Sequence, residues 1–150
     1  MADTETAIAV DAEALRQEVK AKYREVAIDP DGDYRFHTGR YLAAGLGYDG
    51  AVVDGLPDAA VECFAGVANP LSLHPLGLGE HVVDAGAGAG FDSFMAAAQV
   101  GADGRVIGID MTEEMLAKSR PTAAAMGLDK VNSETGCSKT CRWRMAGPTW

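Results

Sequence analysis

The N-terminal part of the chain has apolar residues at helical spacing. Within residues 11–28 they recur every three or four positions, and Lys, Arg and Glu fill the remaining faces. The apolar positions are Leu15, Val19, Tyr23 and Val26. This spacing predicts an amphipathic helix, which the turn-forming sequence DPDGD at residues 29–33 ends. Two roles stay open for the helix: it covers a sheet, or it folds over a ligand with Tyr23 as a contact.

The middle of the chain changes to short apolar runs separated by glycine-rich turns. Residues 82–85 and 105–110 are rich in Val and Ile, and each run carries an aspartate at or near its end. An Ala-rich stretch over residues 91–100 lies between them, and Gly101 and the loop after it supply its stop. The pattern predicts a strand, a helix and a second strand, which together form a βαβ unit.

Helices are also predicted on both sides of this unit. Leu-Pro-Asp at residues 56–58 begins one that runs through Phe64. After the second strand, Thr112 is the expected N-cap of another helix, which Gly127 ends. Pro121 lies inside that helix and should kink it or shorten it at Arg120.

The turn after the first predicted strand has the pattern D-x-G-x-G-x-G. Its residues are Asp84, Gly86, Gly88 and Gly90. Glycines let the backbone take positive φ and let a ligand lie against backbone amides. A dinucleotide-binding turn needs a sixth-position glycine, where this chain has Phe91 or Ser93. A carboxylate repels a pyrophosphate but attracts the ammonium and sulfonium groups of S-adenosylmethionine, so the turn predicts a cationic cofactor. The alternative is an ordinary turn in a chain with 18 glycines.

A second acid supports the cofactor interpretation. Asp110 ends the second predicted strand about 20 residues past the turn, where βαβ units present a carboxylate to ribose hydroxyls. Met111 follows it and is suited to lie on an adenine face. Both predicted strands are therefore expected to present acids at their carboxyl ends.

Residues 80–92 and 104–116 together resemble the class I S-adenosylmethionine-dependent methyltransferases, and within them the branch of arsenite methyltransferases. The resemblance implies an α/β fold, here the N-terminal part of a Rossmann-like domain with its first βαβ unit and a helical N-terminal cap. It implies that Asp110 binds the ribose, that Met111 packs on adenine, and that the turn holds the methionine part. The turn residues concerned are Asp84, Ala85, Gly86, Ala87, Gly88 and Gly90. The implied reaction is methyl transfer from S-adenosylmethionine to a small-molecule acceptor, and no catalytic residue is identified.

The resemblance departs at one position that bears on the acceptor. Arsenite methyltransferases carry a cysteine before a Gly-Asn-Pro sequence, as one of the thiolates that bind trivalent arsenic, and Val67 occupies that place. Cys63 lies nearby in a different register, where an ordinary buried cysteine is expected. Arsenite is therefore disfavoured as the substrate. His74 and His81 are expected at the surface or in a linker. His37 and Arg40 are expected in a solvated turn, and the alternative is that they close over a substrate or the cofactor carboxylate; neither is assigned a catalytic role.

Composition restricts the partners. A formal net charge of −9 argues against a nucleic-acid or anionic-membrane surface. The 150 residues contain no apolar run of membrane-spanning length, no secretory leader is apparent, and three cysteines do not form a disulfide framework. These features predict a cytoplasmic protein, and the oligomeric state stays unknown.

The last segment, residues 132–150, differs from the rest. It holds both tryptophans and two of the three cysteines, and it lacks β-alternation. Cys137 and Cys141 lack the second ligand pair of a zinc site, so no metal site is predicted. Three regions are expected: a cap and linker (1–79), the start of the cofactor-binding domain (80–131) and an aberrant, disordered tail (132–150). The alternatives to an active methyltransferase are a non-catalytic cofactor-binding fragment or inactive remnant and, less favoured, a nicotinamide-dependent oxidoreductase.

We hypothesise that this tail is translated out of frame and that the methyltransferase domain is incomplete. Back-translation of residues 132–150 with GC-rich codons and one added G gives, in the neighbouring frame, the sequence EFRDGLLEDLPVEDGWADV. That sequence resembles the next segment of the methyltransferase family. Sequencing the parent gene across the Val131 codon should reveal a shifted frame. An intact frame that encodes the present tail would refute the hypothesis.

Overall fold

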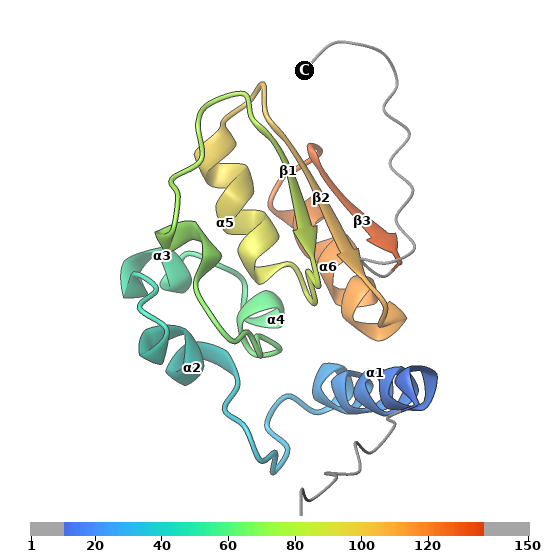
Figure 1. The fold of residues 1–150 in the computed structure, drawn as a ribbon. Helices are drawn as coiled ribbons and strands as arrows, with labels where there is room; N and C mark the ends of the chain where they lie inside the picture. Colours follow the sequence, from blue (N-terminus) through green and yellow to red (C-terminus); the bar gives the residue numbers. More distant parts are fainter. Residues whose placement is uncertain (1–10, 137–150) are drawn as a thin grey trace, which may run out of the picture.

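The computed structural model describes residues 11–136. Four helices and a 3₁₀ turn come first: α1 (Ala12–Ile28), α2 (Gly39–Gly45), α3 (Gly50–Asp54), α4 (Asp58–Val61) and η1 (Pro70–Ser72). An α/β unit follows: β1 (His81–Ala85), α5 (Phe91–Val100), β2 (Arg105–Asp110), α6 (Glu113–Ala125) and β3 (Val131–Thr135) (Figure 1). Within residues 11–136, no helix is long and apolar enough to cross a bilayer. The cysteines of the predicted tail, Cys137 and Cys141, lie outside the described residues.

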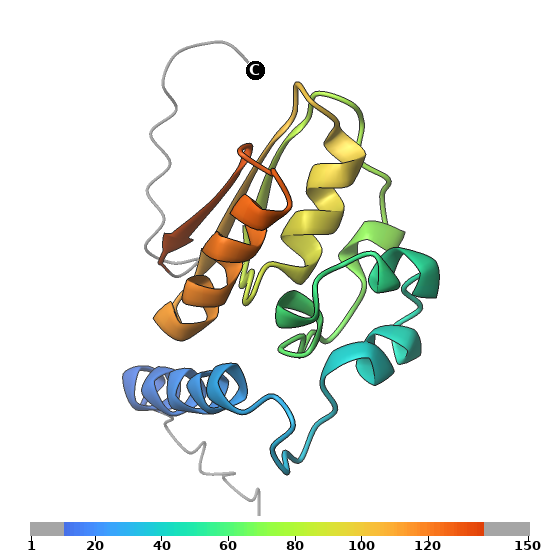
Figure 2. The same ribbon diagram turned by 180° about the vertical axis from the view of Figure 1, so that it is seen from behind.

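The three strands form one parallel sheet in the order β1-β2-β3. Val106 of β2 pairs with Val82 of β1 and with Val131 of β3, so β2 is the central strand. Both crossover helices, α5 and α6, lie on the same face of this sheet (Figure 2). The predicted α/β fold with a parallel βαβ unit is confirmed.

Helix α5 fills the space between the sheet and the N-terminal helices. Its side chains are apolar nearly all round, and Phe94, Ala97 and Val100 are at most 1% exposed. Glycines in left-handed conformations bound it, with φ of +97° at Gly90 and +69° at Gly101. Seven of its ten residues are buried, which explains why the Ala-rich segment lacks a broad polar face, since a helix with an exposed side normally carries one.

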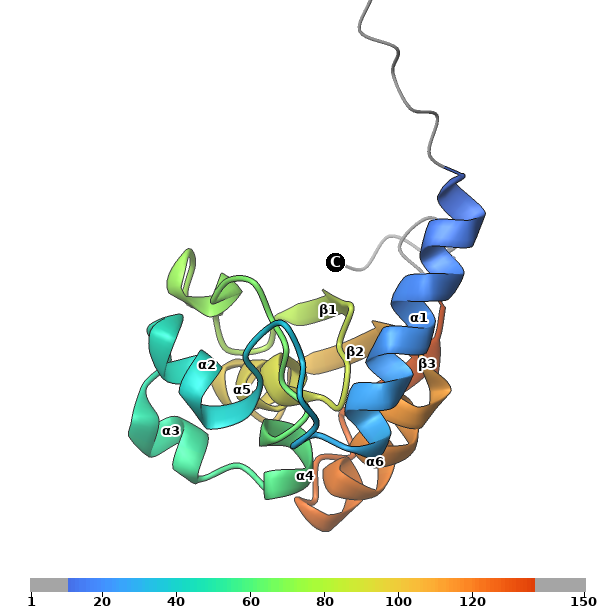
Figure 3. The ribbon, with the colours of Figure 1, turned by 90° about the horizontal axis from the view of Figure 1, so that it is seen from below.

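Helix α1 extends past the carboxyl ends of the strands and lies beside α6, as Figure 3 shows from below. Asp11 caps it by accepting hydrogen bonds from the backbone of Glu13 and Ala14. Val26 is fully buried in a small cluster that includes Met115 of α6. The predicted amphipathic helix is therefore confirmed, and it is placed where strand ends of α/β proteins bind ligands.

The structure corrects the expected end of regular structure. Residues 132–135, assigned to the aberrant tail, belong to β3, so the described sheet has three strands and not two. The segment lacks apolar alternation because only Val131 is buried there. Its strand conformation comes from the backbone instead, since β2 offers an edge of N–H and C=O groups that need partners.

Two helix boundaries also differ from the predictions. Helix α6 continues through Pro121 to Ala125. Pro121 lies on the exposed side of the helix, where water can solvate the carbonyl that loses its donor, while the buried side of the helix packs on the sheet. Helix α4 ends at Val61, earlier than the predicted Phe64. Gly127 follows α6 with a φ of +66°, as expected for a helix-ending glycine.

Replacement of Gly90 by alanine should destabilise the fold strongly. A Cβ there would lie 2.5 Å from Cζ of Phe94 and 2.8 Å from Oγ of Ser119, in addition to the strain of a positive φ. We expect Gly90→Ala to lower the free energy of unfolding by about 2–4 kcal/mol in urea denaturation. The control is Gly127→Ala, where φ is also positive but no atom lies within 4 Å of the added Cβ. It should lose only about 1 kcal/mol, and equal losses would contradict the packing explanation.

Candidate functional site

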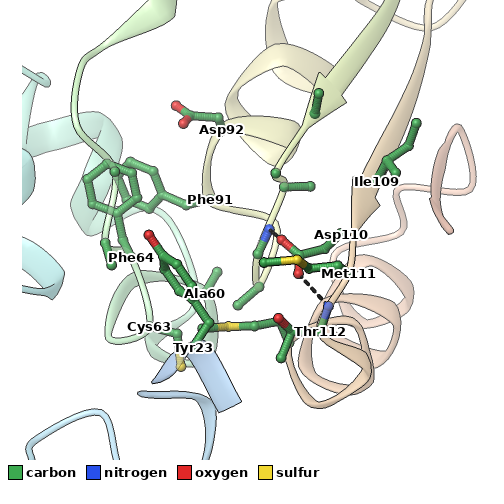
Figure 4. Close-up of a pocket in the computed structure, with 18 of the residues that line it drawn as sticks. Tyr23, Ala60, Cys63, Phe64, Phe91, Asp92, Ile109, Asp110, Met111 and Thr112 are labelled. Carbon is green, nitrogen blue, oxygen red and sulfur yellow. Dashed lines mark hydrogen bonds between the residues drawn. The ribbon is translucent and has the colours of Figure 1, made fainter. Parts of the chain in front are cut away.

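A cavity of about 360 Å³ lies at the carboxyl ends of β1 and β2 (Figure 4). The glycine turn and the start of α6 form one side of it, and Tyr23 of α1 and the segment after α4 form the other. Six of the predicted site residues line it: Ala85, Gly86, Ala87, Gly88, Asp110 and Met111. The fold therefore brings the two predicted halves of the site together.

The glycine turn is fastened to the end of β2. The backbone N–H groups of Gly86 and Ala87 both donate to the carbonyl of Ile109, at 2.7 and 3.0 Å. Gly86 and Gly88 have φ of +91° and +53°, and a Cβ at either would meet nothing within 4 Å. The backbone of the turn is thus fixed in place while its open side borders the cavity.

Asp110 connects the turn to helix α6. Its Oδ2 accepts a hydrogen bond from the Gly88 N–H at 2.9 Å, and its Oδ1 accepts one from the Thr112 N–H at 2.7 Å. Each carboxylate oxygen has two lone pairs, so both can accept a further hydrogen bond from a ligand hydroxyl. The carboxylate is held at the position predicted for ribose binding.

Two predicted site residues do not border the cavity. Asp84 points under α5, where its Oδ2 accepts a hydrogen bond from the Ser93 hydroxyl at 2.6 Å. Burial raises the pKa of its carboxyl group. Gly90 begins α5 and packs on Phe94. Successive strand residues point to opposite faces, and Asp84 points to the face that α5 covers, so it lies behind the turn and not in the cavity. Its predicted contact with the cofactor stays a prediction.

The acid that does line the cavity beside the turn is Asp92, which sequence reasoning missed. Its Oδ1 accepts a hydrogen bond from the Tyr48 hydroxyl at 2.6 Å. Burial raises the pKa of Asp92 to about 6, despite the opposing effect of this bond. The signal in the sequence was its place in the first turn after the glycines, where helix N-termini favour acids.

Three aromatic side chains attach the N-terminal region to α5. The rings of Phe64 and Phe91 stack with centroids 4.0 Å apart, and Tyr48 meets Phe91 edge-on at 5.1 Å. Phe64 and Phe91 line the cavity. These contacts join residues far apart in the chain, so no local pattern predicted them.

Comparison with known proteins agrees with this geometry. A family profile described as a methyltransferase domain matches residues 77–137. The arsenite methyltransferase of Halobacterium salinarum is 37% identical over 149 residues, a match that covers 89% of this chain. Residues 77–137 belong to the class I S-adenosylmethionine-dependent methyltransferases. The match spans 38% of the length of the H. salinarum protein.

Solved structures show the same relationship. An arsenic(III) S-adenosylmethionine methyltransferase from Chlamydomonas reinhardtii is 34% identical with a TM-score of 0.52, over 57% of this chain and 30% of that one. A phosphoethanolamine N-methyltransferase from Haemonchus contortus matches 89% of this chain and 24% of its own, with a TM-score of 0.56. At 21% identity it shows the fold alone. The predicted family, fold and cofactor class are confirmed.

The methyltransferase cavity suits S-adenosylmethionine. Its volume falls in the range of pockets for ligands of this size. At Gly86 and Gly88 the backbone borders empty space, which the side chain of any larger residue would occupy. The carboxylate of Asp92 gives the cavity a negative group for a cationic ligand. The residues present therefore fit the family cofactor.

The N-terminal region adds further contacts to the cavity. Tyr23 and Val67 line it, so α1 both packs on α6 and contributes a residue to the cavity wall. Cys63 also lines it but is only 3% exposed, and the Lys118 ammonium group donates to its sulfur at 3.1 Å. Arg40 instead pairs with Asp54 and Asp58 outside the cavity. The three histidines, His37, His74 and His81, lie at the surface as expected.

Replacement of Asp92 by asparagine should stabilise the protein in a pH-dependent way. The folded state raises the pKa of Asp92 above its ordinary value near 3.8 to about 6, so it favours the protonated carboxyl group. Stability is therefore lost as pH rises from about 4 through 6, and the cost is fully present above that range. Asp92→Asn keeps an acceptor for Tyr48 without the charge. We expect a gain of about 1–2 kcal/mol at pH 7.5, after allowance for solvent screening, and much less at pH 4.

Urea denaturation at the two pH values measures this effect. Asp103→Asn is the matched control, because Asp103 is an exposed carboxylate in the loop after α5. It should change stability little at either pH. A gain for Asp92→Asn that is equal at pH 4 and pH 7.5 would show that the charge of this carboxylate is not the cause.

Proposed function

We propose that this chain supplies the S-adenosylmethionine-binding part of a methyltransferase that acts on a small-molecule acceptor. The observation that carries the proposal is the attachment of the glycine turn to Asp110 beside one cavity. The similarity to an arsenite methyltransferase over most of this chain supports it. The cofactor-binding part is taken to include β3, so it extends from residue 80 to at least residue 135.

Each side of the cavity has a distinct task in this proposal. Gly86 and Gly88 let the methionine part of the cofactor approach the backbone, and Asp92 attracts its positive charge. Asp110 accepts hydrogen bonds from the ribose hydroxyls, and Met111 packs on the adenine. Asp84 acts as a positioning residue, because its bond to Ser93 joins β1 to α5 beneath the turn.

S-adenosylmethionine, when bound, supplies an activated methyl group for transfer to a nucleophilic acceptor. The residues of this chain orient the cofactor and keep water from it, which lowers the entropic part of the barrier. Tyr23, Phe64 and Phe91 provide the apolar walls for this. No general base is assigned to any residue.

The cavity favours a small organic acceptor over arsenite. Trivalent arsenic is a soft centre that needs thiolate ligands. Among the described residues, Cys63 is the one thiol at the cavity, and it is buried beside Lys118. Val67, at the position where the resemblance expects a cysteine, is apolar and 93% exposed. The cytoplasmic location and the absence of nucleic-acid and membrane partners stay predictions of the sequence.

Calorimetric titration tests the proposal and separates it from its alternatives. S-adenosylhomocysteine should bind and NAD should not. Binding of NAD alone would favour an oxidoreductase, and binding of neither would favour an inactive remnant. Asp110→Ala removes charge-assisted hydrogen bonds to the ribose and should weaken S-adenosylhomocysteine binding by about 10–100-fold.

Asp110 also supports the turn, so a milder variant is needed. Asp110→Asn keeps one acceptor oxygen, and its affinity should lie between those of the wild type and Asp110→Ala. Asp103→Ala removes an exposed acid from a loop at the opposite ends of the strands and serves as the control with unchanged affinity. Unchanged affinity in both Asp110 variants would mean that Asp110 does not contact the ligand.

A further inference from the structure

Thr112 occupies the N-cap position of α6, but its side chain does not cap the helix. The residue is 1% exposed. Within residues 11–136, its Oγ1 is the one buried side-chain polar atom without a hydrogen-bond partner. Thr112 was predicted from the sequence as an ordinary N-cap, so the structure places an unexpected unpaired hydroxyl here.

The other buried hydroxyl groups of the described chain are all paired. Ser93 donates to Asp84, Ser119 bonds with Ser133, and Thr122 donates to the carbonyl of Lys118. Burial of an unpaired hydroxyl is unfavourable, and such groups in folded proteins call for an explanation. Thr112 is thus an exception among residues that otherwise follow the rule.

Among the residues that the structure describes, no backbone group near Thr112 forms a hydrogen bond with its hydroxyl. Oδ1 of Asp110 accepts the Thr112 N–H, and the Thr112 carbonyl accepts from the backbone of Met115 and Leu116. The first turn of α6 is therefore begun by backbone contacts and by Asp110. The Thr112 side chain lines the cavity, and in Figure 4 its hydroxyl points toward the cavity, away from the α6 ribbon.

We propose that Thr112 is a further ligand-binding residue, whose hydroxyl hydrogen-bonds the nucleoside part of the cofactor. This inference rests on the proposed function. Figure 4 shows Thr112 at the end of the cavity near Met111 and Tyr23, with Asp92 at the other end. The cationic methionine part is drawn toward Asp92, which leaves the uncharged purine and sugar for the end that holds Thr112. A neutral hydroxyl, which both donates and accepts, suits those neutral groups.

The test replaces the hydroxyl by a methyl group of the same shape. Thr112→Val should weaken S-adenosylhomocysteine binding by about 3–10-fold, the effect of one neutral hydrogen bond. Methylthioadenosine, which shares the nucleoside but lacks the amino acid, should weaken by the same factor. The ligand-free variant should melt about 2–6 °C higher, because the unpaired buried hydroxyl is gone. Thr112→Ser restores the hydroxyl and should recover wild-type affinity for both ligands.

A matched control lies on the same helix. Thr122→Val also removes a buried hydroxyl, but a paired one that does not line the cavity. It should lower the melting temperature without any change in affinity.

Three outcomes would overturn the proposal. Unchanged affinity of Thr112→Val with a lower melting temperature would show a helix cap, and unchanged affinity with a higher one would show an unused hydroxyl. Weaker binding of S-adenosylhomocysteine but not of methylthioadenosine would place the contact on the amino acid. Failure of the wild type to bind S-adenosylhomocysteine would instead refute the proposed function.

Discussion

The two hydrogen bonds that the Asp110 carboxylate accepts hold the site together. One fastens the glycine turn through Gly88, and the other fixes the start of α6 through Thr112. Asp110 ends β2, the central strand, which is paired on both sides. These two bonds therefore fix the position of both loops relative to the sheet. The carbonyl of Ile109 adds two bonds to the same turn. A ligand that reaches this edge meets a backbone already held in one conformation, which reduces the ordering that binding requires.

Two carboxylates, Asp84 and Asp92, lie close to the glycine turn but in different positions. Asp84 lies beneath α5 and supports the turn through Ser93, while Asp92 lines the cavity and is held by Tyr48. Burial raises the pKa of both carboxyl groups; the charge of Asp84 further raises the pKa of Asp92, and that of Asp110 further raises the pKa of Asp84. A cation bound nearby relieves this unfavourable burial of charge. These buried charges therefore cost stability near neutral pH, and under the proposed function a cationic ligand offsets part of that cost.

The aromatic contacts explain how the N-terminal helices take part. Tyr48, Phe64 and Phe91 join the region before the sheet to the first turn of α5, directly beside the glycine turn. Helix α1 closes another side through its packing on α6 and through Tyr23. The cavity is therefore shared between the N-terminal helices and the sheet, and neither part forms it alone.

Local patterns in the sequence were enough for the elements and for much of the site. These patterns involve only residues close together in the chain, so the sequence shows them directly. They are the helical spacing of apolar residues in α1, the alternating glycines before α5 and the acids near the strand ends. The sequence also indicated Gly86, Gly88, Asp110 and Met111 as residues of the binding site.

The sequence did not show contacts between distant residues, since only folding brings Tyr48 to Asp92 or Phe64 to Phe91. The tertiary structure alone decided that Asp84 lies behind the turn and Asp92 in the cavity, that β3 pairs with β2 without apolar alternation, and that the Thr112 hydroxyl is buried unpaired. The physical reason is the same in each case: the outcome depends on which groups of other elements cover or satisfy the residue.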